Sequence, residues 1–157
     1  MLIASLSLND LAATERLGLF LADRLGGGDV LALNGPLGAG KSAMARAMIQ
    51  HLCPDETDIP SPTFTLVQTY EPLDRAAIWH FDLYRLAAPE DAFALGIEEA
   101  FVEAICLIEW PDRLDGYLPA TVLTLELTPI AGADTARQVT ISGNEDWLQR
   151  LDGVARL

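Results

Sequence analysis

Residues 30–52 restrict the possible folds more than any other part of the chain, because an apolar run, a glycine-rich loop and a helical stripe follow one another directly. The run at 30–33 shows no polar alternation, which is typical of a strand covered on both faces, as in parallel sheets. From residue 41 onward apolar side chains recur at helical spacing until Pro54 ends the stripe. This order of strand, loop and helix predicts an α/β domain.

The glycine-rich loop matches the pattern G-x-x-x-x-G-K-[ST] at every fixed position. Glycines allow backbone N–H groups to turn inward around phosphate oxygens, and the following helix N-terminus favours an anion. A lysine at this position is predicted to contact the β- and γ-phosphates, and the hydroxyl after it to bind Mg²⁺. The alternative is a glycine-rich turn with a solvated lysine. We expect a site for ATP and Mg²⁺ that includes Gly35, Pro36, Leu37, Gly38, Ala39, Gly40, Lys41, Ser42 and Ala43.

The choice of ATP over GTP follows from the lysine content. Lys41 is the only lysine in the chain. Guanine recognition in this class of protein usually uses an Asn/Thr-Lys-x-Asp loop, which needs a second lysine. The sequence therefore favours ATP, although another way of reading the base stays open.

Two carboxylates follow apolar strands. Asp82 comes after residues 78–81 and Glu109 comes after residues 105–108. Each is predicted to lie at the C-terminal edge of the sheet, where ligands bind in open α/β folds. The alternative for an isolated carboxylate is a helix cap or a solvated turn. We assign Glu109 to the metal, directly or through water, and Asp82 to positioning the attacking water or acting as a base.

The segment 59–64 joins the helix predicted after residue 41 to the next strand, and it contains two prolines and two hydroxyl side chains. By itself it reads as a stiff turn. Beside a phosphate loop, the same place often contains a loop that senses the γ-phosphate, which makes Thr63 a candidate. Trp79 and His80 alternate on a strand, so one should face the core and the other the site. We interpret His80 as a satisfied core histidine.

The remaining pattern predicts a single domain over residues 1–157, with a P-loop NTPase-like mixed β-sheet flanked by helices. Residues 1–8 are interpreted as running straight into a first helix at about 9–25, with a capping-box start at 7–10. The other expected elements are an antiparallel strand pair at 65–70 and 77–81, a helical segment at 89–101 interrupted at Gly96, late strands at 121–127 and 137–141, and a final helix capped by Asn144.

Charge and composition narrow the partners. The chain has 10 Lys and Arg against 23 Asp and Glu, a formal net charge of −13, so most of its surface repels the phosphate backbone of nucleic acids. Direct strong nucleic-acid binding is not expected. No apolar run approaches the ~18 residues that a membrane span needs. Without the basic start of a signal peptide, the expected location is cytoplasmic, and Cys53 and Cys106 are expected to be buried reduced thiols.

Several segments together resemble the TsaE (YjeE) family, the small ATPases of bacterial tRNA threonylcarbamoyladenosine synthesis. Their order and spacing agree with the family over about residues 30–113. The glycine-rich loop is generic, whereas the H-F-D-L-Y-R and I-E-W-P segments are specific. The segments that carry the resemblance are 37–42 (LGAGKS), 61–67 (SPTFTLV), 80–86 (HFDLYRL), 95–98 (LGIE) and 105–111 (ICLIEWP).

The resemblance implies an ATPase that does not itself make the modified base. Such a protein assembles with two partners, TsaB and TsaD, and uses ATP hydrolysis to sustain their turnover. An acidic chain can serve tRNA chemistry in this way if a partner holds the RNA. Carried over by position, the resemblance places Lys41 and Ser42 at phosphate and Mg²⁺, Thr63 in a switch-like loop, Asp82 as the catalytic carboxylate, Glu109 at the metal, Trp110 at a functionally sensitive position, and Thr14 and Arg137 near the adenine or ribose.

One departure from the family concerns Pro36, where the family commonly has Asp. Proline removes a backbone donor and a carboxylate, so turnover is expected to differ, while the phosphate contacts should survive. Ser42 replaces the more usual Thr and keeps the hydroxyl.

Two alternative functions stay open on the sequence. A small-molecule P-loop kinase would need a lid with clustered arginines, and the arginines here are scattered. A nucleotide-dependent binding module would bind partners with negligible hydrolysis. Phosphate release without a phosphorylated acceptor argues against the first, and multiple turnover with partners argues against the second.

Overall fold

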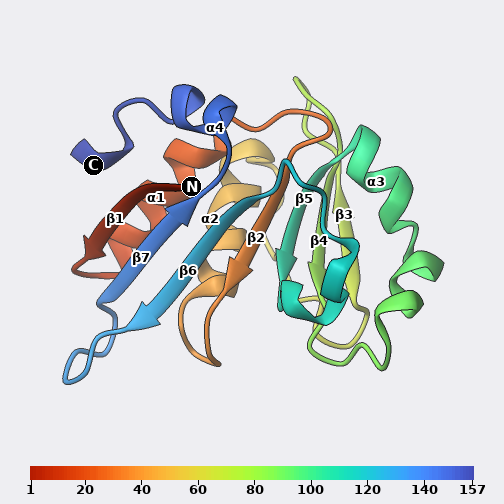
Figure 1. Ribbon diagram of the computed structural model, residues 1–157, viewed down its shortest axis with the longest axis horizontal. Coiled ribbons are helices and arrows are strands. Elements are labelled where there is room, and N and C mark those ends of the chain that lie inside the picture. The colour runs from red at the N-terminus through yellow and green to blue at the C-terminus, as the bar shows by residue number, and fades with distance from the viewer.

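The computed structural model describes residues 1–157 and contains one seven-stranded sheet with the order β1-β7-β6-β2-β5-β4-β3 (Figure 1). Strands β2, β4, β5 and β6 run parallel to one another in the centre, whereas β1, β7 and β3 are antiparallel to their neighbours. The predicted P-loop NTPase-like mixed sheet is therefore confirmed. The strand bounds are β1 Leu2–Leu8, β2 Val30–Asn34, β3 Val67–Tyr70, β4 Ile78–Asp82, β5 Ile105–Glu109, β6 Leu123–Pro129 and β7 Arg137–Ser142.

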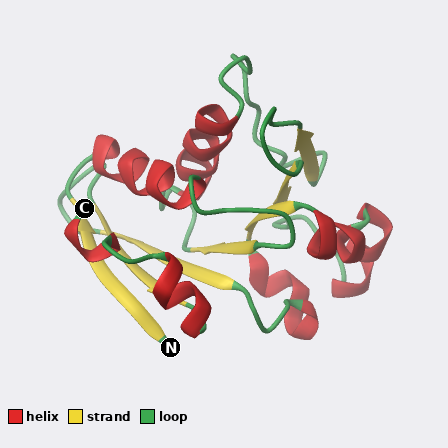
Figure 2. Cartoon of the chain, turned by 90° about the horizontal axis from the view of Figure 1, so that it is seen from above, coloured by secondary structure: helices red, strands yellow, loops and turns green.

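Helices cover both faces of the sheet, as the view from above shows (Figure 2). Because side chains alternate along a strand, Leu31 and Leu33 of β2 point into one core while Val30 points into the other. The first core is closed by helices α1 (Leu11–Ala22), α2 (Lys41–Leu52) and α4 (Glu145–Arg150). The second lies under α3 (Ile97–Glu103) and the short 3-10 helices η1 (Pro89–Leu95) and η2 (Pro111–Tyr117), and a last 3-10 turn, η3, spans Val154–Arg156.

The N-terminal segment differs from the expectation. Residues 1–8 do not lead directly into a helix, because Leu2–Leu8 forms edge strand β1 against β7. Helix α1 then begins at Leu11, with Asp10 accepting a hydrogen bond from the N–H of Ala13 at 2.8 Å, and it ends at Ala22. The predicted capping segment 7–10 was wrong at Ser7 and Leu8, which pair with β7, a strand far away in the sequence, although Asp10 of that segment is the N-cap. The helix ends at Ala22, three residues before the expected end at 25.

Most other elements lie where they were predicted, with shifted ends. The strands at 67–70 and 78–82 form the expected antiparallel pair. The helical segment after residue 89 breaks at Gly96, whose φ of +82° is left-handed, although its first half is a 3-10 helix. The late strands each run one or two residues further than expected, to Pro129 and Ser142. Asn144 caps the final helix by accepting from the N–H of Trp147 at 3.0 Å, as predicted.

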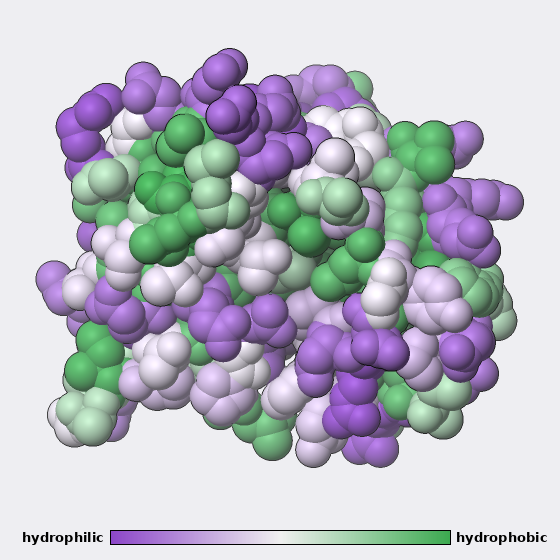
Figure 3. Space-filling model, viewed as in Figure 1, coloured by the Kyte–Doolittle hydropathy of each residue, from purple (hydrophilic) through white to green (hydrophobic).

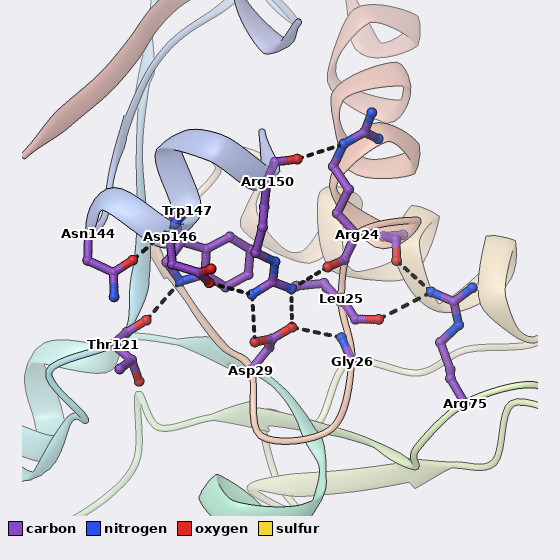
Figure 4. A network of polar contacts seen from close by, with 11 residues as sticks. Arg24, Leu25, Gly26, Asp29, Arg75, Thr121, Asn144, Asp146, Trp147 and Arg150 are labelled. Carbon is purple, nitrogen blue, oxygen red and sulfur yellow. Dashed lines mark hydrogen bonds and ion pairs between the residues drawn. The ribbon is translucent and has the colours of Figure 1, made fainter. Parts of the chain in front are cut away.

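A polar network fixes helix α4 to the loop before β2 (Figure 4). The guanidinium of Arg150 binds both carboxylate oxygens of Asp29, which also accepts from the N–H of Gly26 at 2.8 Å. Arg24 donates to the carbonyls of Phe20 in α1 and Arg150 in α4. Arg75 donates to the carbonyls of Ala22 and Leu25 at the end of α1 and after it. We call the residues Arg24, Asp29, Arg75 and Arg150 the clasp.

The distribution of apolar surface residues and the burial of the two cysteines can be compared with what the sequence predicts. Apolar residues on the face drawn in Figure 3 form separate patches divided by hydrophilic ones. Cys53 and Cys106 are both buried and free, as expected. No helix is long and apolar enough to cross a membrane.

Candidate functional site

The glycine-rich loop joins the end of β2 to the start of α2. Gly35 has a φ of +150°, and a Cβ there would lie 2.5 Å from the carbonyl oxygen of Leu127, so only glycine fits. Gly40, with a φ of +103°, precedes α2 and offers no side-chain cap. The N–H groups of Lys41, Ser42 and Ala43 consequently donate to no protein group. A helix N-terminus with free amides attracts an anion.

Arg137 at the start of β7 holds this loop in place. Its Nε donates to the carbonyl of Ala39 at 2.7 Å and its Nη2 to the carbonyl of Gly38 at 2.8 Å. Its Nη1 donates to two carbonyls of the hairpin before β7. Because every nitrogen of the guanidinium is bonded to main chain, Arg137 fixes the loop conformation in this structure, and its predicted contact with adenine or ribose stays a prediction.

The side chain of Lys41 turns back into the glycine-rich loop that precedes it. Its Nζ donates to the carbonyls of Gly35 and Pro36 and lies 3.5 Å from the centre of the Trp110 ring. Burial lowers the pKa of Lys41, although the nearby carboxylates of Glu109 and Asp82 oppose that change. Trp110 holds its ring there with a left-handed φ of +58°, which is rare for a bulky residue and recurs at functional sites.

Glu109 links the first turn of α2 to strand β4. Its Oε1 accepts a hydrogen bond from the Ser42 hydroxyl at 2.7 Å, and its Oε2 lies 2.6 Å from Nε2 of His80. Both Glu109 and His80 are almost completely buried, at 2% and 0% exposed. Buried charges persist only where they are paired or hydrogen-bonded, so this contact stabilises the carboxylate.

Asp82 links β4 to the segment before β3. Its Oδ2 accepts from the Thr63 hydroxyl at 3.0 Å, and its Oδ1 accepts from the N–H of Tyr84 at 3.1 Å. The Thr63 oxygen also lies 2.9 Å from the hydroxyl of Ser61. The segment 59–64 therefore does more than turn the chain, because its hydroxyl contacts the carboxylate at the end of the strand.

The sheet register brings the two carboxylates together. Asp82 of β4 pairs directly with Glu109 of parallel strand β5, which confirms that both end at the same edge of the sheet. His80 lies two residues before Asp82 and on the same face, toward α2, while Trp79 points into the second core. His80 is buried as expected, but it is not satisfied, because its Nδ1 has no hydrogen-bond partner.

One cleft of about 360 Å³ collects most of the predicted site residues. The two exceptions are Gly35 and Pro36, which belong to the loop but do not line the cleft. The carbonyl of Pro36 accepts a hydrogen bond from the N–H of Ala39 at 3.1 Å. Thr14 of α1 is buried and reaches the cleft wall. The predicted residues that line the cleft are Thr14, Leu37, Gly38, Ala39, Gly40, Lys41, Ser42, Ala43, Thr63, Asp82, Glu109, Trp110 and Arg137.

Sequence reasoning missed part of the lining. Leu11, Arg46 and Thr135 also line the cleft. Arg46 could have been found, because it lies four residues after Ser42 and so on the same side of the helix. Leu11 and Thr135 reach the cleft through the fold alone, and no local pattern marks them.

A larger groove of about 690 Å³ lies beside this cleft between α1 and α2. It shares Leu11, Ala43 and Arg46 with the cleft but contains neither Asp82 nor Glu109. None of its lining polar side chains is buried. The chemistry-bearing groups therefore belong to the smaller cleft.

The oxygen donors of the cleft fit Mg²⁺. The Ser42 hydroxyl and the Glu109 carboxylate are adjacent hard ligands, which Mg²⁺ prefers. No group of three or more His, Cys, Asp or Glu residues is arranged to hold a metal ion by itself. Mg²⁺ commonly binds through one or two protein oxygens together with substrate phosphates, and this donor set suits that mode.

Comparisons with known proteins agree with this geometry. The sequence model of the family described as "Threonylcarbamoyl adenosine biosynthesis protein TsaE" matches residues 8–139. A "tRNA threonylcarbamoyladenosine biosynthesis protein TsaE" from Rickettsia felis is 42% identical over 122 residues, which cover 78% of this chain and 71% of the relative. The protein of the same name from Haemophilus influenzae is 42% identical over 110 residues, which cover 69% of this chain and 66% of the relative.

A solved structure extends the likeness to the whole fold. The crystal structure of YdiB from Bacillus subtilis superposes with a TM-score of 0.78 at 26% identity, covering 99% of this chain and 97% of that one. The family match spans the phosphate loop, Thr63 and both carboxylates. From these matches, together with the cleft at the edge of the mixed sheet, the chain belongs to the TsaE family, whose members are named for threonylcarbamoyladenosine biosynthesis.

Proposed function

We propose that this protein binds and hydrolyses ATP with Mg²⁺ as a cytoplasmic component of the tRNA threonylcarbamoyladenosine modification machinery, where it sustains the turnover of a TsaB–TsaD complex. The observation that carries the proposal is the Ser42 hydroxyl, 2.7 Å from Glu109 and directly after Lys41, at the start of a helix with free amides. This combination supports a triphosphate and its metal in one cleft.

Binding of the triphosphate is assigned to the loop and to Lys41. The free N–H groups of residues 41–43 would donate to phosphate oxygens. Lys41 would exchange the carbonyls of Gly35 and Pro36 for the β- and γ-phosphates. The negative charge of the ligand would also offset the burial that lowers the pKa of Lys41.

Ser42 and Glu109 are the residues that would hold Mg²⁺. The ion, when bound, neutralises charge on the phosphate oxygens and orients them. Glu109 is assigned to the metal directly or through a water molecule. Because Glu109 is 2% exposed, its carboxylate has little competing solvent.

Asp82 is assigned to the attacking water, as a base or a positioning group. Thr63 and the N–H of Tyr84 each donate to one of its oxygens, so the carboxylate is held in one orientation. Each oxygen keeps a further lone pair that a water could use. The hydroxyl of Thr63 ties the 59–64 segment to this carboxylate, which supports a segment that responds to the γ-phosphate.

The partners are proposed from the family. Relatives are named for biosynthesis of a modified tRNA base, and TsaB and TsaD are the proteins that the resemblance implies as partners. The formal net charge of −13 disfavours direct contact with RNA, so a partner would hold the tRNA.

The test combines ATP hydrolysis with a reconstituted modification assay. The isolated protein is expected to hydrolyse ATP slowly, with a changed rate when TsaB and TsaD are added. Lys41→Ala should abolish binding of a fluorescent ATP analogue, and Lys41→Ala, Asp82→Ala and Glu109→Ala should each stop sustained product formation. Product formation at the wild-type level by all three variants would refute the role assignments.

The same assay separates the two alternative functions. A phosphorylated small-molecule acceptor in place of free phosphate would indicate a kinase. A wild-type protein that binds its partners in an ATP-dependent way but completes no more than one turnover would indicate a binding module.

A further inference from the structure

We propose that His80 is a positioning residue for Glu109, which it holds in the orientation that lets the carboxylate and Ser42 act together on the metal. The inference rests on the proposed function, because it concerns the metal that accompanies the nucleotide. Its own content is that the buried imidazole determines how tightly that metal binds.

The contact involves three elements of the fold. Nε2 of His80 on β4 lies 2.6 Å from Oε2 of Glu109 on β5, and Oε1 of the same carboxylate accepts from Ser42 on α2 at 2.7 Å. One carboxylate oxygen therefore faces the imidazole, and the other faces the hydroxyl. The torsion at the end of a glutamate side chain is broad, so without the imidazole the carboxylate plane could rotate away from Ser42.

The position of the imidazole proton follows from its surroundings. Nδ1 of His80 is buried without a hydrogen-bond partner. A carboxylate oxygen only accepts hydrogen bonds, so the nitrogen of His80 that faces Glu109 must carry a proton. A proton is therefore assigned to Nε2, which donates it to Glu109.

The burial of His80 argues against a purely structural role. The side chain is 0% exposed and lies on the sheet face covered by α2, where its strand neighbour Ile78 belongs to the apolar core. An apolar residue would pack there without leaving a nitrogen unpaired. Partners behind a metal ligand commonly orient it, and their loss lowers metal affinity by about 10–100-fold.

Two variants separate positioning from packing. In His80→Gln the amide nitrogen reaches about as far as Nε2 and can still donate to Glu109. In His80→Asn the amide is shorter, stays polar and stops near the position of Nδ1. His80→Leu is a third variant, which fills the space without any donor, and thermal unfolding of all three shows whether each is folded.

The measurement is the Mg²⁺ concentration that gives half-maximal tightening of ADP binding, together with ADP affinity in EDTA. We expect His80→Asn and His80→Leu to raise that concentration by about 10–100-fold with unchanged ADP affinity in EDTA, and His80→Gln to stay close to wild type. Equal Mg²⁺ dependence in the wild-type protein and in a folded His80→Asn variant would overturn the inference. An equal loss of Mg²⁺ affinity in His80→Gln and His80→Asn would overturn it as well.

A second measurement needs no nucleotide. Nitrogen-15 spectra of the imidazole in the wild-type protein should show a proton on Nε2, and an Nε2 without a proton would contradict the assignment. If the wild-type protein binds Mg²⁺ neither with ADP nor with a non-hydrolysable ATP analogue, the proposed function fails and the inference fails with it. If the wild type binds normally and only the His80 result is negative, the proposed function stands and the positioning role falls.

Discussion

The clasp around Asp29 and the cleft around Glu109 are both clusters of charged side chains on the same molecule, but they differ in how completely their polar groups are hydrogen-bonded. In the clasp, Asp29 is bonded to both Arg150 and the N–H of Gly26, and Arg24 and Arg75 are bonded to carbonyls. In the cleft, the first amides of α2 have no partner.

Burial sharpens the contrast. The side chains of Arg150 and Asp29 are 29% and 18% exposed, whereas Asp82 and Glu109 are 4% and 2% exposed. The more deeply buried carboxylates of the cleft are hydrogen-bonded but, unlike Asp29, have no arginine partner. Unpaired buried groups cost folding free energy, so we infer that the clasp serves stability and that the cleft keeps unused bonding capacity for a ligand.

The largest expected effect is that of Asp82→Asn on catalysis. The amide keeps the shape and the bond from Tyr84 but cannot accept a proton from water, so kcat for ATP hydrolysis should fall by about 10²–10⁴-fold. Removing a buried charge should leave the free energy of unfolding unchanged or higher. Steady-state hydrolysis and urea unfolding check both, with exposed Asp152→Asn as the matched control. Full activity in Asp82→Asn would show that hydrolysis does not need the Asp82 carboxylate, and the contrast between the cleft and the clasp would not hold.

The opposite pattern is expected for Arg150→Met. This change leaves the partly buried Asp29 without its cation, and the free energy of unfolding should fall by about 1–2 kcal/mol, since both groups are partly exposed. ATP affinity should stay at the wild-type value. Exposed Arg156→Met removes the same charge nearby and should change neither quantity. A loss of ATP affinity without a loss of stability would show that the clasp is part of the site.

A smaller effect is expected at the boundary of the cleft. The ammonium of Lys41 lies 3.5 Å from the centre of the Trp110 ring, so its movement to a phosphate should change tryptophan fluorescence on ATP binding. Trp110→Phe should remove that change, and Trp79→Phe, in the second core, should retain it. An undiminished signal in Trp110→Phe would mean that Lys41 does not move relative to the ring.

The smallest effect concerns the core on the opposite face of the sheet, which contains Cys106. Burial raises the pKa of the Cys106 thiol to about 12. At pH 8 the native protein should therefore alkylate at Cys106 far more slowly than the unfolded chain, because the thiolate is the reactive form. Above the ordinary pKa of 9.0 the unfolded chain loses this proton first, so the free energy of unfolding should fall as the pH rises toward 12. Mass spectrometry of alkylated peptides checks the rate, and rapid native labelling at Cys106 would contradict its burial.

The sequence was sufficient for the parts of the site that depend on local order. The phosphate loop is a contiguous motif, and Asp82 and Glu109 each end an apolar strand, so their common edge follows from parallel pairing. Residues whose position depends on distant pairing were missed. Strand β1 had a readable signal in the alternation from Ala4 to Leu8, but the helical pattern after it dominated the interpretation.

His80 illustrates the limit more sharply. Its burial could be predicted from the strand, but its bond to Glu109 depends on which strand lies beside β4 and in which register. No local spacing between residues 80 and 109 contains that information. Sequence patterns identify the elements, and the sheet register decides which side chains meet.

The most direct test of the central claim is a crystal structure with a non-hydrolysable ATP analogue and Mg²⁺. We expect the β- and γ-phosphates to lie within the loop at residues 35–42, in contact with Lys41 and the first amides of α2, with the metal beside Ser42 and Glu109. A nucleotide bound elsewhere on the molecule, with this cleft empty, would contradict the account.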